Sequence, residues 1–484
     1  MTNPGTPKRP NILWICTDQQ RFDTLGCYAN PFVRTPNIDR LAASGVLFER
    51  CYSQSPVCTP SRVSFLTGRY PRTTRCRQNG QSIPGDEVLV TKLLADADTT
   101  GGLSGKLHIS ACHPKVAPVT ERRVDDGYAE FHWSHHPDPN WPANEYFRWL
   151  SEQGVSYGRV PYGGSSYVQV SVPPRYHQTT WCAQKAIDHI EAAAGSGRPW
   201  LFSVNFYDPH HPFDPPPEYL QRYLDQLDNI PLPAYTEGEL LDKPVFQQID
   251  HRAAYNMPGN YPFPDMSAED HRLVRAAYWA MIDLIDEQVG RMLKALEATG
   301  QLEDTLVVFM SDHGEMLGDH GIYLKGPYFY EPAVRVPMLV SWPGTIPAGG
   351  RSGALVELVD LAPTLLEASG LPVHAGMQGR SLWPLLSGQA AEHRQDVYCE
   401  YYNAMPWHKD PAPQATMLRT GRYKLVAMHG LGTGELYDLQ ADPTETRNLW
   451  SDDGYAGVKL AMLERLCDRM AWTVDPLPLR EADW

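Results

Sequence analysis

Short apolar runs alternate with helical patterns along most of this chain, and this alternation limits its fold more than any other feature. Four runs have the length and composition of buried strands: 11–17, 200–206, 305–310 and 336–341. Residues 268–299 place apolar side chains at three- and four-residue spacing, which is typical of a helix. Strands that alternate with helices usually form a parallel sheet. We therefore predict an α/β fold with a large, mainly parallel sheet covered by helices on both faces.

The pattern changes near residue 391, where short alternating apolar runs take over. The runs at 422–426 and 435–439 flank a glycine-rich turn, which favours antiparallel pairing. We predict a large α/β domain at 1–390 and a small C-terminal α+β subdomain and tail, with an antiparallel sheet, at 391–484.

Two long stretches, 113–180 and 207–265, are rich in Pro, Gly and aromatic residues and lack a clear period. Such excursions either form the walls of a pocket or cover the surface, and the sequence favours neither. Several rings in the first stretch could line a pocket, although ordinary packing is the commoner role: Trp133, His135, His136, Trp141, Tyr146 and Tyr162.

Charge and cysteine content exclude several kinds of partner. The chain has 42 Lys+Arg against 57 Asp+Glu, a formal net charge of −15, which disfavours a nucleic-acid partner.

We find neither a signal-peptide pattern nor an apolar run long enough to span a bilayer. Nine widely spaced cysteines resemble neither a disulfide scaffold nor paired zinc motifs. We expect a cytoplasmic protein without membrane contact. Its tail, from Trp472 to Trp484, could dock on its own body or in a homo-oligomer.

The most informative segment is Cys58-Thr-Pro-Ser-Arg-Val-Ser-Phe-Leu-Thr-Gly-Arg69. Taken alone, Cys58 is either a nucleophile acidified by a helix N-terminus and Arg62 or, more commonly, a structural cysteine beside a capping Ser61. The segment resembles the Cys-x-Pro-Ser-Arg…Leu-Thr-Gly-Arg signature of the type I, formylglycine-dependent sulfatases of the alkaline phosphatase superfamily. That resemblance implies that a formylglycine-generating enzyme oxidises Cys58 and reads Pro60 and Arg62.

The same resemblance implies a reason for the modification. The hydrate of an aldehyde carries two hydroxyls on one carbon, so one can attack sulfur and the other can later expel the sulfate. A serine would stop at a stable sulfate ester. Arg62 is then expected to stabilise the hydrate.

Polar pairs follow two of the predicted strands. Asp18 and Gln19 follow the first, and Asp312 and His313 follow the strand that ends at 310. Isolated pairs of this kind are usually loop caps, but these match the family's metal ligands, together with Cys58. The resemblance implies one divalent cation, Ca²⁺ first, with Mn²⁺ or Mg²⁺ as alternatives. Many arylsulfatases have Asp and Asn in place of Gln19 and His313. These two residues look instead like those of choline sulfatases and phosphonate monoester hydrolases.

Further segments match family positions that handle the transferred anion. Lys106 and His108 lie in a Gly-Lys-x-His segment, which implies a sulfate-binding lysine and a base for collapse of the hydrate. His210 lies in a Pro-His-x-Pro match, which implies the general acid for the leaving alcohol, with a protonated imidazole. The alternative is a proline-locked loop whose histidines face solvent. Lys325 matches the family's last sulfate-binding lysine.

Two more residues are predicted to bind substrate: Asn79, at a polar position of the choline sulfatase and phosphonate hydrolase branches, and His211, beside His210. The resemblance covers nearly the whole chain. It implies a sulfuric ester hydrolase acting on a small aryl or alkyl sulfate. The alternatives are a phosphonate monoester hydrolase or phosphodiesterase with the same site, and a silent binding protein whose Cys58 stays a thiol. Lys106 and His108 favour the sulfatase, because phosphonate hydrolases carry Tyr and Thr in this region.

Overall fold

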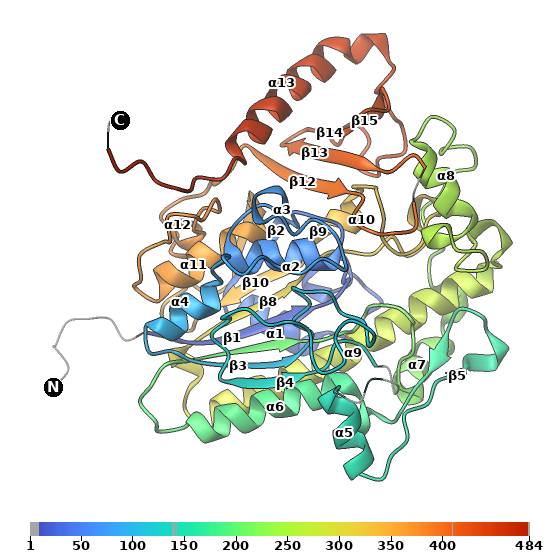
Figure 1. Cartoon of the computed structure of the whole chain (residues 1–484). Coiled ribbons are helices and arrows are strands. Elements are labelled where there is room, and N and C mark those ends of the chain that lie inside the picture. The colour runs from blue at the N-terminus through green and yellow to red at the C-terminus, as the bar shows by residue number, and fades with distance from the viewer. Residues whose placement is uncertain (1–8, 138–140, 142, 409, 483–484) are drawn as a thin grey trace.

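The computed structural model describes residues 9–482 except 138–140, 142 and 409. Its centre is a nine-stranded sheet (Figure 1) in the order β11-β2-β10-β8-β1-β7-β3-β4, with β9 paired to β2. Neighbours from β8 to β4 are all parallel. The strands are β1 (Asn11–Thr17), β2 (Val46–Tyr52), β3 (Thr100–Gly105), β4 (Glu130–Trp133), β7 (Trp200–Asn205), β8 (Thr305–Ser311), β9 (Arg335–Val336), β10 (Met338–Ser341) and β11 (Gly350–Glu357).

Side chains of β1 alternate between two apolar cores, one on each face of the sheet. Leu13 and Ile15 belong to the core that α1 (Pro36–Ala43), α6 (Gln178–Ala193) and α9 (Ala268–Ala298) cover. Ile12, Trp14 and Cys16 belong to the core covered by α2 (Cys58–Thr67), α4 (Val90–Asp96) and α11 (Leu361–Ala368). Figure 1 shows these two helical layers on opposite sides of the sheet. A strand buried on both faces explains why its sequence is almost wholly apolar.

A second, antiparallel sheet follows in the chain, with the order β12-β13-β14-β15 (Figure 1). Its strands are Asp396–Tyr402, Gln414–Thr420, Tyr423–Met428 and Thr433–Asp438. Leu418, Leu425 and Leu436 of this sheet pack with Met462 and Leu466 of α13 (Ala456–Trp472). The remaining helices are α3 (Pro71–Thr74), α5 (Glu145–Glu152), α7 (Pro217–Leu224), α8 (Val245–Arg252), α10 (Glu331–Val334) and α12 (Trp383–Leu386), and a two-stranded ribbon pairs β5 (Val160–Pro161) with β6 (Gln169–Val170).

The predicted fold class is confirmed, with one local correction. The run 336–341 was expected to be a single strand, but Pro337 separates β9 from β10, since proline cannot donate a ladder hydrogen bond. β10 also runs antiparallel to both of its neighbours. The division of the chain into domains at 390/391 stays a prediction.

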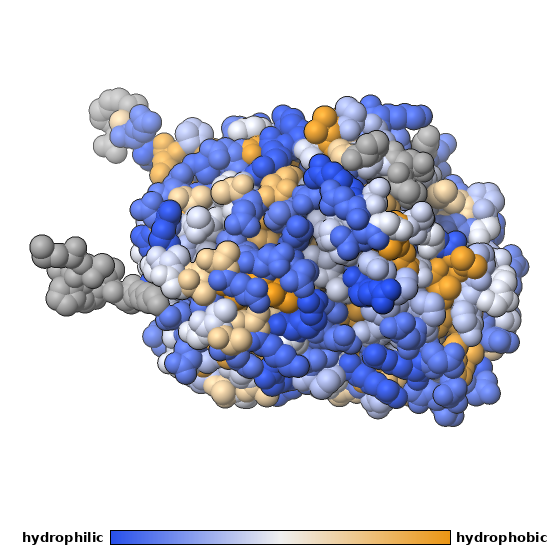
Figure 2. Space-filling model, turned by 90° about the horizontal axis from the view of Figure 1, so that it is seen from below, coloured by the Kyte–Doolittle hydropathy of each residue, from blue (hydrophilic) through white to orange (hydrophobic). Residues whose placement is uncertain are grey.

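The face of the molecule seen from below is mostly polar (Figure 2). The face in Figure 2 is largely hydrophilic, with apolar residues in small separate groups. No helix of the described residues is both long and apolar enough to cross a membrane. Trp472, Val474 and Leu479 near the C-terminus are exposed, whereas Trp484, named with the predicted docking tail, lies outside the described residues.

Candidate active site

The candidate site lies where four neighbouring parallel strands end at the same edge of the sheet. Asp312, Asp18 and Lys106 directly follow β8, β1 and β3, and His210 lies in the loop after β7. Thr17 is in register with Ser311, so Asp18 and Asp312 leave the sheet side by side. The carboxyl ends of parallel strands are where open α/β sheets bind ligands.

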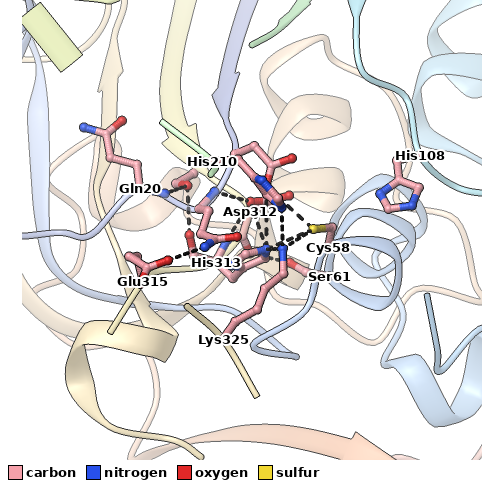
Figure 3. A network of polar contacts seen from close by, with 12 residues as sticks. Gln20, Cys58, Ser61, His108, His210, Asp312, His313, Glu315 and Lys325 are labelled. Carbon is pink, nitrogen blue, oxygen red and sulfur yellow. Dashed lines mark hydrogen bonds and ion pairs between the residues drawn. The ribbon is translucent and has the colours of Figure 1, made fainter. Parts of the chain in front are cut away.

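Four potential ligand atoms converge at this edge. Those of Asp18, Cys58, Asp312 and His313 all lie within 4.8 Å of one another, and all four residues are buried. Cys58 is the first residue of α2, which packs on one face of the sheet. The Nδ1 atom of His313 lies 2.9 Å from the carbonyl oxygen of Gly314, which leaves Nε2 facing the sulfur of Cys58 at 3.1 Å (Figure 3). A histidine ligand is commonly oriented through its other nitrogen in this way.

The donors fit a divalent cation. Two buried carboxylates and an imidazole nitrogen supply oxygen and nitrogen ligands, and the buried Oε1 atom of Gln19 has no hydrogen-bond partner among the described residues. Gln19 has a left-handed backbone (φ 66°), and its N–H donates to Oδ1 of Asp312 at 3.0 Å. The two predicted ligand pairs are thus joined directly.

Three cations surround the carboxylates and the sulfur. The Nζ atom of Lys106 is hydrogen-bonded to Asp18, the Nε atom of Arg62 lies 2.8 Å from Oδ2 of Asp312, and Nζ of Lys325 lies 2.9 Å from the sulfur of Cys58. Burial and the charge of Asp18 raise the pKa of Cys58, but Lys106 and Lys325 outweigh them and lower it to about 7. The site therefore favours an anion at residue 58.

His210 and His211 form the side of the site nearest Lys325. The Nε2 atom of His210 lies 3.0 Å from Nζ of Lys325, and the two imidazoles stack at 4.2 Å. Burial and the charge of Lys325 hold the pKa of His210 well below its usual range. Both effects disfavour the protonated ring that the sequence predicts, so the role of His210 as general acid stays a prediction. The histidine is also not a free solvent-facing side chain, because it contacts Lys325.

His108 and Asn79 reach the site through Thr59, the residue after Cys58. Nε2 of His108 lies 3.0 Å from Oγ1 of Thr59, and Asn79 Oδ1 accepts from the Thr59 N–H at 2.9 Å. Figure 3 shows His108 apart from the contacts that join Cys58 to Lys325. Burial, followed by the charge of Lys106, holds the pKa of His108 well below its ordinary value. Thus the residues that meet directly are Asp18, Gln19, Cys58, Arg62, Lys106, His210, Asp312, His313 and Lys325, and Asn79, His108 and His211 surround them.

Comparison with known proteins identifies the family. The model of the Sulfatase family matches residues 10–371. The chain belongs to the sulfatase family. A second model, N-sulphoglucosamine sulphohydrolase, C-terminal, matches residues 318–471 of this sulfatase. Membership of the sulfatase family confirms the enzyme class expected from the sequence, a sulfuric ester hydrolase.

Relatives of this sulfatase span nearly its whole length. It is 30 % identical to the uncharacterized sulfatase YidJ of Escherichia coli, over 99 % of this chain and 90 % of the relative. It is also 30 % identical to a choline-sulfatase of Rhizobium meliloti, over 92 % of this chain and 83 % of the relative. The solved structure of a phosphonate monoester hydrolase from Silicibacter pomeroyi superposes with a TM-score of 0.84 at 26 % identity, covering 97 % of each chain.

Sequence reasoning missed one supporting residue of the sulfatase site and gave another a different role. Glu315 is buried and accepts from Nε2 of Gln19 and from the N–H of Leu317 at 2.8 Å. Its place in the Ser311-Asp-His-Gly-Glu segment was the available signal. Ser61 was considered as a helix cap, but its hydroxyl instead donates to the carbonyl oxygen of Asp312 at 2.5 Å. It lies inside α2, whose N-cap residue is Val57, and so ties the helix to the loop after β8.

Both excursions border the sulfatase site, but not through all of the rings singled out in the sequence. Trp133, Trp141 and Tyr146 are fully buried packing residues. The ring of His135 lies 4.5 Å from that of His108. From the second excursion, the Tyr207 ring lies 5.6 Å from Nζ of Lys106. Parts of each excursion thus border the candidate site, and their role as walls of a substrate pocket stays a prediction.

Proposed function

We propose that this sulfatase hydrolyses a small aryl or alkyl sulfate monoester, with residue 58 acting as formylglycine after maturation by a formylglycine-generating enzyme. The observation that carries the proposal is the position of Cys58, whose sulfur lies 2.9 Å from Nζ of Lys325 and 3.1 Å from Nε2 of His313. The aldehyde hydrate would supply one hydroxyl to attack sulfur and a second to expel the sulfate.

The cations of the site are suited to hold the transferred group. Lys106 lies on the side of residue 58 where it contacts Asp18, and Lys325 on the side where it contacts His210. A sulfate at residue 58 can therefore accept hydrogen bonds from both ammonium groups. Such fixed donors stabilise the charge that grows on the oxygens in the transition state. Arg62 keeps Asp312 oriented through the contact of its Nε atom with Oδ2.

Proton transfer falls to two histidines. Once a bound sulfate draws the ammonium of Lys325 away, Nε2 of His210 is free to hold a proton, which it gives to the leaving alcohol. His108, beside Thr59, takes the proton whose loss releases sulfate from residue 58.

We further propose that Asp18, Gln19, Asp312 and His313 hold one divalent cation, Ca²⁺ first and Mn²⁺ or Mg²⁺ as alternatives, together with residue 58. The convergence of the Asp18, Cys58, Asp312 and His313 ligand atoms within 4.8 Å supports this assignment. When bound, such an ion acts as a Lewis acid that stabilises negative charge on oxygen.

A second candidate function is the hydrolysis of phosphonate monoesters. It is favoured by the similarity to the Silicibacter pomeroyi enzyme and by the Asp18–Gln19 and Asp312–His313 pairs. Lys106 and His108 argue for sulfate, since the phosphonate hydrolases resembled here carry hydroxyl side chains in that region. Both esters present a tetrahedral centre with anionic oxygens to the same cations.

The deciding experiment is the ratio of kcat/KM for 4-nitrophenyl sulfate and 4-nitrophenyl phenylphosphonate. The protein is coexpressed with a formylglycine-generating enzyme, and mass spectrometry verifies loss of the Cys58 sulfur. The ratio of the two kcat/KM values reports how much more tightly the enzyme binds one transition state than the other. Because Lys106 and His108 favour sulfate, we expect a ratio of at least about ten in favour of the sulfate ester. A ratio that favours the phosphonate would assign the second function. Cys58→Ala protein, prepared in parallel, measures the background from contaminating hydrolases.

A further inference from the structure

Tyr255 has an unusual backbone beside the candidate site. It belongs to the second excursion and has a left-handed conformation, with φ 62°. A bulky residue rarely adopts this conformation, because its Cβ crowds the backbone. Its ring stacks on the indole of Trp407, with centroids 4.5 Å apart and planes at 15°. Trp407 lies in the loop after β12, so a segment far from Tyr255 in the sequence holds the tyrosine ring in place.

The hydroxyl of Tyr255 is buried without a partner. The residue is 4 % exposed, and its hydroxyl makes no hydrogen bond among the described residues. Two nearby buried tyrosines are satisfied: Tyr261 donates to the carbonyl oxygen of Tyr167 at 3.1 Å, and Tyr278 donates to that of Gln19 at 2.6 Å. An unsatisfied buried hydroxyl costs free energy, and an oxygen of a bound substrate would supply the missing partner.

A run of rings connects Tyr255 to the reacting groups. Its ring lies 5.7 Å from that of His211, which stacks on His210, whose Nε2 atom contacts Lys325. Burial, and then the charges of Glu315 and Cys58, hold the pKa of the Tyr255 hydroxyl well above its ordinary value. Cys58 is 1 % exposed, so the reacting residue is enclosed to a similar degree. Tyr255 is thus buried on the side of the candidate site where His210 and His211 lie.

We infer that Tyr255 determines specificity for the alcohol part of the ester, donating its hydroxyl to an oxygen of an aromatic alcohol. The flat faces of Tyr255 and His211 suit an aryl group, and Trp407 is a positioning residue that keeps the tyrosine in place. The inference rests on the proposed ester hydrolysis and narrows its substrate to aryl esters. The sulfate itself stays with Lys106 and Lys325.

The test is Tyr255→Phe, which removes only the hydroxyl. The substrate is 4-nitrocatechol sulfate, a chromogenic aryl sulfate with a free phenolic oxygen. We expect KM to rise about tenfold, because one net hydrogen bond to the substrate is lost, and kcat to stay nearly unchanged. Inorganic sulfate, which lacks the alcohol, should inhibit the variant with an unchanged Ki. The melting temperature should stay the same or rise, because an unsatisfied polar group has been removed.

Three results would overturn the inference: an unchanged KM, a parallel rise of KM and of the sulfate Ki, or a lowered melting temperature. The matched control is Tyr261→Phe, which loses the bond to Tyr167 and should lower the melting temperature while leaving KM unchanged. Trp407→Ala should raise KM without changing the sulfate Ki, whereas Trp407→Phe, which keeps an aromatic face against Tyr255, should restore it.

Failure of the proposed function is a separate outcome. Wild-type turnover of the sulfate ester tests that function, and the ratio of variant to wild type tests the role of Tyr255. Where the wild-type enzyme acts on aryl phosphonates instead, the same comparison is made with the phenylphosphonate monoester of 4-nitrocatechol, which keeps the free phenolic oxygen, and with phenylphosphonate as the anion without the alcohol. An unchanged KM for the preferred ester then overturns the inference on its own.

Discussion

At the scale of single residues, Cys58 is the position on which the chemistry depends. Among the described residues, the contacts of its sulfur are with groups of the candidate site, Lys325, His313 and Asp18. We expect Cys58→Ala to lower kcat by at least about 10³-fold while the melting temperature stays within a few degrees. Cys58→Ser should release one equivalent of alcohol in a burst and then stop, as a serine ester cannot collapse to an aldehyde. Rapid-quench kinetics measures the burst, and sustained turnover by the serine variant would contradict the need for a hydrate.

Glu315 makes a second residue-scale prediction. Its carboxylate positions the amide of Gln19 and also accepts the N–H of Leu324 at 2.5 Å. Glu315→Gln should misorient the amide and weaken metal binding by about 10- to 100-fold, the usual effect of losing a group that orients a ligand. Calorimetric titration with Ca²⁺ and Mn²⁺ measures the change. The control is Glu239→Gln, which alters a buried carboxylate that contacts His320 and not the amide of Gln19. This variant should leave metal affinity unchanged.

At the scale of elements, a buried ion cluster ties the C-terminal sheet to α10. The Nζ atom of Lys424, on β14, lies 2.8 Å from Oε1 of Glu331 and 2.6 Å from Oε1 of Glu445. Lys424→Met would leave two buried carboxylates facing each other, and we expect a loss of about 3–5 kcal/mol in the free energy of unfolding. Urea titration measures it. Adding Glu331→Gln should recover part of the loss, and a cost below about 1 kcal/mol in the single variant would contradict this account.

The same cluster predicts a dependence of stability on pH. Burial opposes the charge on Glu331, but Lys424 prevails and lowers the pKa of Glu331 from 4.5 to about 2. Because the folded-state pKa is the lower one, the stabilisation from this carboxylate is present above pH 4.5 and is lost as the pH falls toward 2. The difference in unfolding free energy between wild type and Glu331→Gln should therefore shrink between pH 6 and pH 3. A difference that grows on acidification would contradict the assignment.

The elements also show what the sequence could predict and why the rest escaped it. Asp18 and Asp312 were predictable because each directly follows an apolar strand, and parallel strands bring their ends together. The direction of β10 was not, because an apolar run of four residues carries no information about which way it pairs. Tyr255 and Trp407 come from segments without a period and meet only through tertiary packing, so no local pattern marks them.

At the scale of the whole molecule, the site joins parts of the chain that pack in different cores. The loops after β1 and β8 leave the central sheet, α2 covers one face, and Lys325 comes from a segment that contributes to the core on the other. The carboxylates of Asp18 and Asp312 are held together by Lys106 and Arg62, which offset their mutual repulsion. We therefore expect ligand binding at this point to stabilise contacts between layers, as well as the local loops.

This arrangement predicts that metal binding stabilises the entire fold. An ion that binds the native chain and not the unfolded one adds about 2.7 kcal/mol at a free concentration 100 times its Kd. We expect EDTA to lower the melting temperature by several degrees and excess Ca²⁺ or Mn²⁺ to restore it, in thermal scans followed by circular dichroism. In Asp18→Asn, which alters one of the four residues whose potential ligand atoms converge, the response to metal should largely disappear. An EDTA effect of equal size in wild type and variant would mean that the stabilising ion binds elsewhere.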